Sequence, residues 1–222
     1  MRLVTAMSSA QHARFGEKMI RSVARYWPRD MLIDLWSEDE ELDGFLELTD
    51  YVEFRKMGEA HRRPGWKYDQ RFAAKVFALT SSALRCDGGV LVWLDADTLT
   101  RKHVTAEVIE EWLPPDKALA YLGRQGSTSE CGVVLYRLDS PKVRAMLAAL
   151  RAAYTSGDVF SLPEWHDSYV FDVMRRAHVP EALQHNLSPG GRGYEHVFEQ
   201  SPVGEYIEHA KGPRRKARLD SN

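Results

Sequence analysis

The stretch Val90-Leu91-Val92-Trp93-Leu94-Asp95-Ala96-Asp97 decides the fold of this chain. Its apolar part, Val90–Leu94, is the most hydrophobic run in the sequence and has the length and composition of a strand buried on both faces. The run ends at Asp95 and Asp97, whose side chains share one face of an extended chain because they lie two residues apart. The carboxyl end of a central strand in an α/β sheet opens onto the crevice where ligands bind.

Two carboxylates in that place suit a hard divalent cation that also holds phosphate oxygens. The alternative is a solvated strand end, where aspartate is common in turns. Because the apolar run lies directly against both acids, the sequence favours a metal site at Asp95 and Asp97.

Length and composition indicate an ordinary globular protein. The 222 residues are enough for one large domain, and 44% hydrophobic and 28% charged residues are typical of soluble chains. No apolar stretch approaches the roughly 20 residues that span a bilayer, and Met1–Ala6 is too quickly polar for a secretory signal. Cys86 and Cys131 are the only cysteines, which predicts no disulfide framework and fits a reducing cytosol. We therefore expect a cytoplasmic protein without a membrane span.

Strands that alternate with helices predict an α/β sandwich with a mostly parallel sheet. Strands are expected at Leu3–Ala6, Met31–Trp36, Tyr51–Phe54, Val90–Leu94, Ala118–Leu122 and Gly132–Tyr136. Helices are expected at His12–Tyr26, Lys67–Arg85, Thr105–Trp112, Pro141–Tyr154 and Glu164–Ala177. The helix at Lys67–Arg85 rests on an apolar stripe of Phe72, Val76, Leu79 and Ala83. From Ser188 the chain shows little periodicity, and it ends in the basic stretch Lys211–Arg218.

The motif Leu91–Asp97, in a chain that begins with a strand, resembles the metal motif of the GT-A glycosyltransferases, especially their glycogenin-like and galactosyltransferase-like members. Glu130–Tyr136 resembles the family's small-Gly-apolar strand, which lines the sugar pocket. His209–Arg215 resembles its C-terminal His-x-x-Gly-x-x-Lys motif. The chain departs from the pattern at Arg215, where the family has lysine, and at Glu130-Cys131, which replaces a polar-small pair.

The resemblance implies a GT-A-like single α/β domain over residues 1–222, with helices flanking a mostly parallel central sheet and a Rossmann-like nucleotide-binding half. Residues 1–100 would bind the nucleotide sugar, residues 101–200 the acceptor, and residues 201–222 would be a basic tail closing over the diphosphate. The implied activity is metal-dependent hexosyl transfer from a nucleotide-diphosphate sugar, first of all a UDP-sugar, to an acceptor hydroxyl.

For the metal, the resemblance implies that Asp97 binds directly and that Asp95 shares the ion or contacts the ribose. His209 would complete the coordination, and a neutral imidazole suits Mn²⁺ better than Mg²⁺. The alternative for His209 is a surface histidine in a polar tail. Gly212 would let the backbone approach the diphosphate, and Arg215 or Lys216 would offset its charge.

Further candidates lie on the helices around the motif. Lys75 interrupts an apolar stretch, so it must either extend to solvent or have a partner, and Arg71 lies on the same helix face. Asp167, near a helix N-terminus, is either a cap, a general base in an inverting enzyme or a sugar-positioning acid in a retaining one. Trp165 is either a stacking residue or a core aromatic. The resemblance adds these donor-binding residues: Thr5, Ala6, Ser8, Ala96 and Gly132.

Two other functions compete. Haloacid-dehalogenase-like phosphohydrolases also carry apolar-Asp-x-Asp after a strand, so Asp95 would be a nucleophile with Thr98 nearby, but there the motif opens the chain. Asp167 and Asp172 also lack the glycine context of that family's later metal ligands. A non-catalytic module whose basic tail binds nucleic acid is the other alternative. The net charge of −2 argues against it, although a nucleic-acid base stays compatible as an acceptor.

Overall fold

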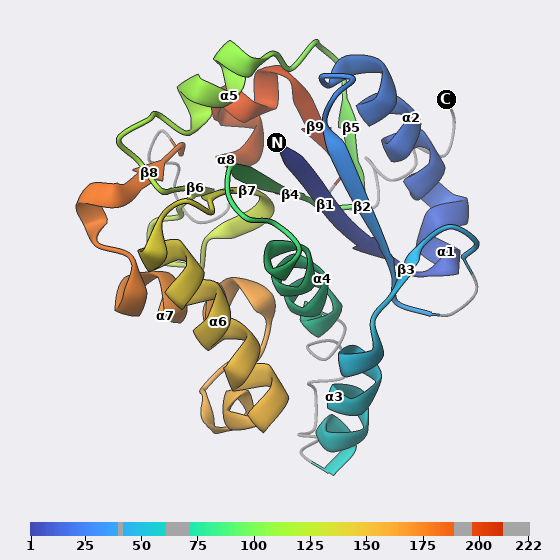
Figure 1. The fold of residues 1–222 in the computed structure, drawn as a ribbon, viewed down its shortest axis with the longest axis vertical. Helices are drawn as coiled ribbons and strands as arrows, with labels where there is room; N and C mark the ends of the chain where they lie inside the picture. Colours follow the sequence, from blue (N-terminus) through green and yellow to red (C-terminus); the bar gives the residue numbers. More distant parts are fainter. Residues whose placement is uncertain (40–41, 61–71, 189–196, 211–222) are drawn as a thin grey trace.

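The computed structural model of the chain describes residues 1–39, 42–60, 72–188 and 197–210, and its centre is a seven-stranded sheet (Figure 1). The strand order is β3-β2-β1-β4-β7-β6-β8. These strands are β1 (Arg2–Met7), β2 (Leu32–Ser37), β3 (Leu46–Glu47), β4 (Val90–Leu94), β6 (Leu119–Leu122), β7 (Glu130–Arg137) and β8 (Gln184–Asn186). β1, β2, β3 and β4 run parallel, and β7 is antiparallel to both β4 and β6. The expected mostly parallel α/β sheet is confirmed.

Helices cover both faces of this sheet (Figure 1). They are α1 (Ser9–Gln11), the π-helix η1 (His12–Gly16), α2 (Glu17–Tyr26), α3 (Thr49–Ala60), α4 (Ala73–Leu84), α5 (Ala106–Trp112), α6 (Pro141–Ser156), α7 (Asp167–His178) and α8 (Val197–Gln200). Short 3₁₀ turns are η3 (Asp158–Ser161), η4 (Glu181–Leu183) and η5 (Pro202–Glu205). Among the described residues, no helix combines the length and apolar character needed to cross a bilayer.

Alternation along the central strands builds two cores, one on each side of the sheet. In β4, Leu91 and Trp93 pack with α3, α4, α6 and α7, whereas Val92 and Leu94 pack with α2, α5 and α8. Because successive side chains of a strand point to opposite faces, a continuous apolar run is what a strand covered on both sides requires. β4 therefore lies in the middle of a three-layer molecule, as its sequence predicts.

Local signals account for the helix ends. The Ser8 hydroxyl accepts from the Gln11 backbone N–H, and the Gln11 side chain accepts from the Ser8 N–H, which closes a capping box at α1. Thr105 caps α5, Pro141 lies in the first turn of α6, and Gly157 ends that helix with a φ of 81°. The expected helix at His12–Tyr26 is thus longer at its start and contains a π-helical turn.

One expected strand is wrong. Tyr51–Phe54 lies inside α3, with Tyr51 and Phe54 buried and Val52 and Glu53 exposed. Residues three apart share one face of a helix, and a run of four residues is too short for its alternation to exclude that. The third strand of the parallel set is instead the short β3, which the sequence analysis missed.

Two helices begin later than expected. α4 starts at Ala73 and buries Val76, Leu79 and Ala83. Phe72 precedes it, is 41% exposed and makes no capping hydrogen bond from its side chain; residues 67–71 of the expected helix lie outside the described part. α7 starts at Asp167 because His166 is its N-cap, whose ring accepts from the Tyr169 N–H.

A second, two-stranded sheet follows the aspartate motif. β5 (Thr98–Thr100) pairs antiparallel with β9 (Ile207–His209), and Thr98 is opposite His209. Neither strand was expected from the sequence. This pairing carries the end of the described chain back to the carboxyl end of β4.

Candidate functional site

A cleft of about 630 Å³ opens at the carboxyl ends of β1 and β4. Its walls come from β1, the turn after β4, β7, and the first residues of α4 and α7. The lining residues are Ala6, Gln11, Phe15, Glu38, Phe72, Lys75, Trp93, Asp95, Ala96, Asp97, Arg124, Thr128, Glu130, Cys131, His166, Asp167, Ser168 and His209. This volume is typical of small-molecule sites.

The turn after β4 fixes the two aspartates. The Asp95 N–H donates to the Gly132 carbonyl oxygen at 2.9 Å, and the Thr98 hydroxyl donates to the Asp95 carbonyl oxygen at 2.7 Å. From the other sheet, the Ala210 N–H donates to the Asp97 carbonyl oxygen at 2.9 Å. Backbone bonds on both sides therefore hold the motif rigidly.

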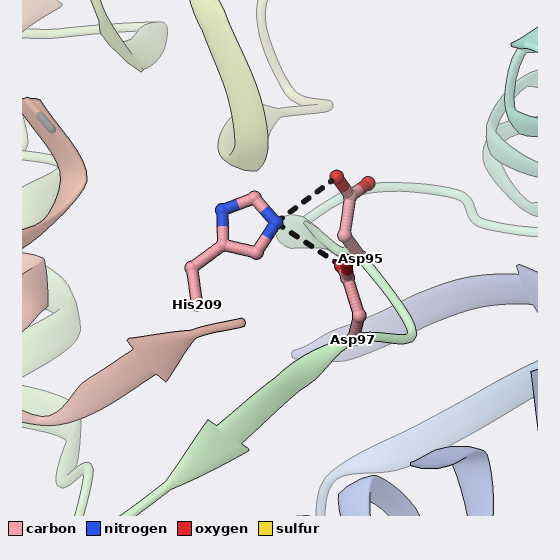
Figure 2. A group of neighbouring side chains, drawn as sticks. All are labelled: Asp95, Asp97 and His209. Carbon is pink, nitrogen blue, oxygen red and sulfur yellow. Dashed lines mark hydrogen bonds and ion pairs between the residues drawn. The ribbon is translucent and has the colours of Figure 1, made fainter. Parts of the chain in front are cut away.

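His209 completes a three-ligand cluster with Asp95 and Asp97 (Figure 2). The His209 Nε2 atom lies 3.1 Å from Asp97 Oδ1 and 3.8 Å from Asp95 Oδ2, and one donor atom from each residue lies within 4.8 Å of the others. Two carboxylate oxygens and one imidazole nitrogen are a donor set that fits Mn²⁺ and, less well, Mg²⁺. The structure brings the expected metal residues together.

The His209 ring is fully buried, and Gly132 makes room for it. A Cβ atom added to Gly132 would lie 2.7 Å from the ring, and Phe198 packs against the ring at 5.0 Å between centroids. His209 is therefore a rigid part of the site and not a histidine on a polar surface. Gly132 itself does not line the cleft.

Lys75 is the centre of the charge network on the other side of the motif. Its Nζ atom lies 3.0 Å from Asp95 Oδ1 and 2.9 Å from Asp167 Oδ2, and it donates to the Cys131 carbonyl oxygen. Burial by itself favours the neutral amine, but the attraction of Asp167 and Asp95 outweighs it and holds the pKa of Lys75 well above its usual value. Lys75 thus has partners and does not extend to solvent.

Trp93 adds to this network from β4. Its indole N–H donates to Asp95 Oδ1 at 2.6 Å, and its ring lies under the Lys75 ammonium at 4.9 Å. Asp95 therefore offers one oxygen to Trp93 and Lys75 and turns the other toward His209.

The start of α7 brings Asp167 into the cleft. Its side chain is 11% exposed and forms an ion pair with Lys75. Asp167 is not the helix cap, because His166 occupies that position.

Trp165 is placed differently: it is 3% exposed, packs on Phe160 and does not line the cleft. Of the two roles left open for Trp165, its position in the core agrees with the core aromatic.

Some of the residues expected to bind the donor line the cleft, and others do not. Ala6 lines the cleft, as does Ala96 in the motif turn. Thr5 is fully buried behind Ala6, and Ser8 closes the capping box with Gln11, so neither is among the lining residues. Arg71, Gly212, Arg215 and Lys216 lie outside the described residues.

Sequence reasoning missed several lining residues. Glu130 and Arg124 pair with each other beside His209, and Gln11 and Phe15 line the opposite part of the wall. The sequence carried a signal only for Glu130, an acid at the start of the apolar run Glu130–Tyr136.

Burial raises the pKa of the Cys131 thiol, so this lining cysteine is held as the unreactive thiol.

Comparisons with known proteins identify the fold. No protein-family model and no curated protein matches the sequence. The chain is similar to the galactosyltransferase LgtC in complex with donor and acceptor sugar analogues, with 13% identity, coverage of 100% of this chain and 95% of that one, and a TM-score of 0.57.

It is also similar to a glycosyltransferase involved in glycosylation of the PBCV-1 major capsid, at 10% identity, a TM-score of 0.55 and coverage of 100% and 98%. Mouse xyloside xylosyltransferase 1 matches at 15% identity over 84% of each chain, with a TM-score of 0.52. The expected GT-A fold is confirmed, and the phosphohydrolase alternative is not favoured.

Proposed function

We propose that this chain, which has the GT-A fold, is a metal-dependent glycosyltransferase that moves a hexose from a nucleotide-diphosphate sugar to an acceptor hydroxyl. The observation that carries the proposal is the Asp95-Asp97-His209 cluster at the carboxyl end of the central strand. Ligands bind at this edge of open α/β sheets.

Asp97, Asp95 and His209 would hold Mn²⁺, or Mg²⁺ as the second choice. A bound divalent cation supplies Lewis-acid stabilisation to a leaving diphosphate. Asp95 would be catalytic as a ligand of this metal beside the leaving diphosphate, and Lys75 and Trp93 hold its Oδ1 atom in place.

Asp167 is the second catalytic residue in this proposal. Its carboxylate lines the cleft and forms an ion pair with Lys75, 2.9 Å away. In an inverting enzyme Asp167 would take the proton of the acceptor hydroxyl, and in a retaining enzyme it would position the transferred sugar. Lys75 would orient Asp167 and Asp95 toward the donor.

The nucleotide would lie along Ala6 and Ala96, with Thr5, Ser8 and Gly132 supporting that wall from behind. Arg71, Gly212, Arg215 and Lys216 would contact the diphosphate. A UDP-sugar is the donor we test first. The two cysteines are free thiols, which supports a reducing, cytoplasmic location. The acceptor is a hydroxyl compound, with a nucleic-acid base among the classes to test.

We further propose one domain over residues 1–222. Residues 1–100 would form the donor half, residues 101–200 the acceptor half, and residues 201–222 a tail that closes over the diphosphate. The β5–β9 pairing supports this division, because it brings the tail to the motif.

Thermal unfolding with UDP, GDP, CDP and ADP, each with and without Mn²⁺, tests the proposal. A ligand that binds the native state raises the melting temperature. We expect one nucleotide to stabilise the protein only with Mn²⁺, and Asp97→Ala to remove that shift while the protein stays folded. Full transferase activity in Asp97→Ala, or no shift with any nucleotide, would refute the metal and donor assignments.

A further inference from the structure

We propose that Glu130 is a positioning residue that orients His209 for metal binding. The inference rests on the proposed metal site and adds to it a carboxylate on the far side of the imidazole ring. It concerns a position where this chain has an acid in an otherwise apolar strand.

The two nitrogens of His209 face opposite groups. Nε2 faces the aspartates, at 3.1 Å from Asp97 and 3.8 Å from Asp95, whereas Nδ1 lies 3.7 Å from Glu130 Oε1. The last distance is within ion-pair range and longer than a hydrogen bond, so Glu130 acts on the ring mainly through its charge. An imidazole can offer its Nε2 lone pair to a cation only when Nδ1 carries the proton. A carboxylate beside Nδ1 stabilises that tautomer and makes Nε2 a better donor.

Glu130 is held firmly enough to do this. It is 1% exposed, and its Oε1 atom accepts from the Gly132 N–H at 3.1 Å. The preceding residue, Ser129, donates its N–H and hydroxyl to the buried Asp172 at 3.0 and 2.6 Å. The carboxylate therefore has one defined position next to the ring.

Arg124 supplies the counter-charge for this carboxylate. Its guanidinium pairs with Glu130 Oε2 from the wall of the cleft, so the buried acid lies beside an opposite charge. The two oxygens of Glu130 thus have different partners: Arg124 on one side, and Gly132 with His209 on the other.

The test is Mn²⁺ affinity in the full chain without nucleotide, for wild type, Glu130→Gln, Glu130→Asp and Glu208→Gln. Glu208→Gln is the matched control, because Glu208 precedes His209 in β9 but pairs with the surface residue Arg101 at 2.8 Å. We expect both Glu130 variants to weaken Mn²⁺ binding about 10-fold or more, the usual effect of removing a partner of a metal-bound histidine. Glu208→Gln should bind Mn²⁺ as the wild type does.

A second readout separates positioning from simple support of the fold. In the Mg²⁺-loaded protein, the Nδ1–H proton of His209 should give a downfield NMR signal that Glu130→Gln shifts and Glu208→Gln leaves in place. Glu130→Asp keeps a carboxylate beside Arg124 but moves it away from the ring. If Glu130→Gln does not fold, the Mn²⁺ affinity of Glu130→Asp therefore tests the positioning role.

Unchanged Mn²⁺ affinity in the folded Glu130 variants would overturn this inference and leave the proposed metal site intact. A wild-type chain that binds no Mn²⁺, or that binds it equally well as His209→Ala, would overturn both.

Discussion

At the scale of single residues, Lys75 carries one positive charge between two carboxylates, Asp95 and Asp167. The lysine therefore reduces the repulsion between the two carboxylates and holds Asp95 Oδ1, while Asp95 Oδ2 faces His209.

Replacement of Lys75 by methionine should lower stability and turnover together. Removing one partner of a buried ion pair costs about 3 kcal/mol, which denaturant unfolding would measure. Mn²⁺ affinity should fall less than turnover, because the change removes a partner of Asp95 but also removes a positive charge near the cation. Lys56→Met is the control, since Lys56 is exposed and pairs with Glu53, away from the cleft residues; a Lys75→Met protein with normal turnover would contradict the assigned role.

Gly132→Ala should damage the metal site through sterics alone. The new Cβ would meet the buried His209 ring at 2.7 Å, and such overpacking costs about 1–3 kcal/mol. We expect weaker Mn²⁺ binding by calorimetry. In a His209→Ala background the same change should cost much less, because only the 3.2 Å contact with Glu130 Oε1 remains, and an equal cost in both backgrounds would show that the ring is not the obstacle.

At the scale of secondary-structure elements, β9 supplies His209, the third residue of the proposed metal cluster. It pairs only with β5 in the described part of the chain, and β5 itself directly follows the motif. The site therefore depends on a short two-stranded sheet that is separate from the seven-stranded one.

Two truncations should separate β9 from the basic stretch that follows it. A chain ending at Ala210 keeps β9 and should bind Mn²⁺ normally but bind nucleotide diphosphate more weakly, because Arg215 and Lys216 are absent. A chain ending at Tyr206 should lose Mn²⁺ affinity as well. Circular dichroism would check that both remain folded, and equal nucleotide binding in the full chain and the Ala210 truncation would refute the role of the tail.

Much of the fold and the motif could be predicted because long apolar or periodic segments carry their own signal. Val90–Leu94 and Pro141–Tyr154 are examples. The short strands β3, β5, β8 and β9 carry too few residues for a pattern, and long-range pairing stabilises them. The pairing of Glu130 with Arg124, and the packing of Trp165 into the core, likewise depend on contacts that no local pattern encodes.

At the scale of the whole molecule, the metal cluster joins the central sheet to the end of the described chain. Asp97 and His209 are 112 residues apart in sequence. Bound metal would therefore crosslink two distant segments and oppose their local opening.

Hydrogen exchange should report this crosslink. With Mn²⁺ or Mg²⁺, amides of β5, β9 and the nearby η5 turn should exchange more slowly, while those of α6, which contributes no residue to the lining of the cleft, should change far less. Mass spectrometry would measure both regions. In His209→Ala the metal-dependent protection should vanish, and protection spread evenly over the chain would instead indicate general stabilisation.

Because β9 supplies His209, a newly synthesised chain acquires the three residues of the proposed metal cluster in a fixed order. The ribosome releases Asp95 and Asp97 long before His209, so a nascent chain carries two of the three ligands and an incomplete cleft wall. The proposed metal cluster would then be completed in one late step, after most of the sheet has been synthesised. On the proposed function, a partly made chain would lack the full cluster until the core around it has closed.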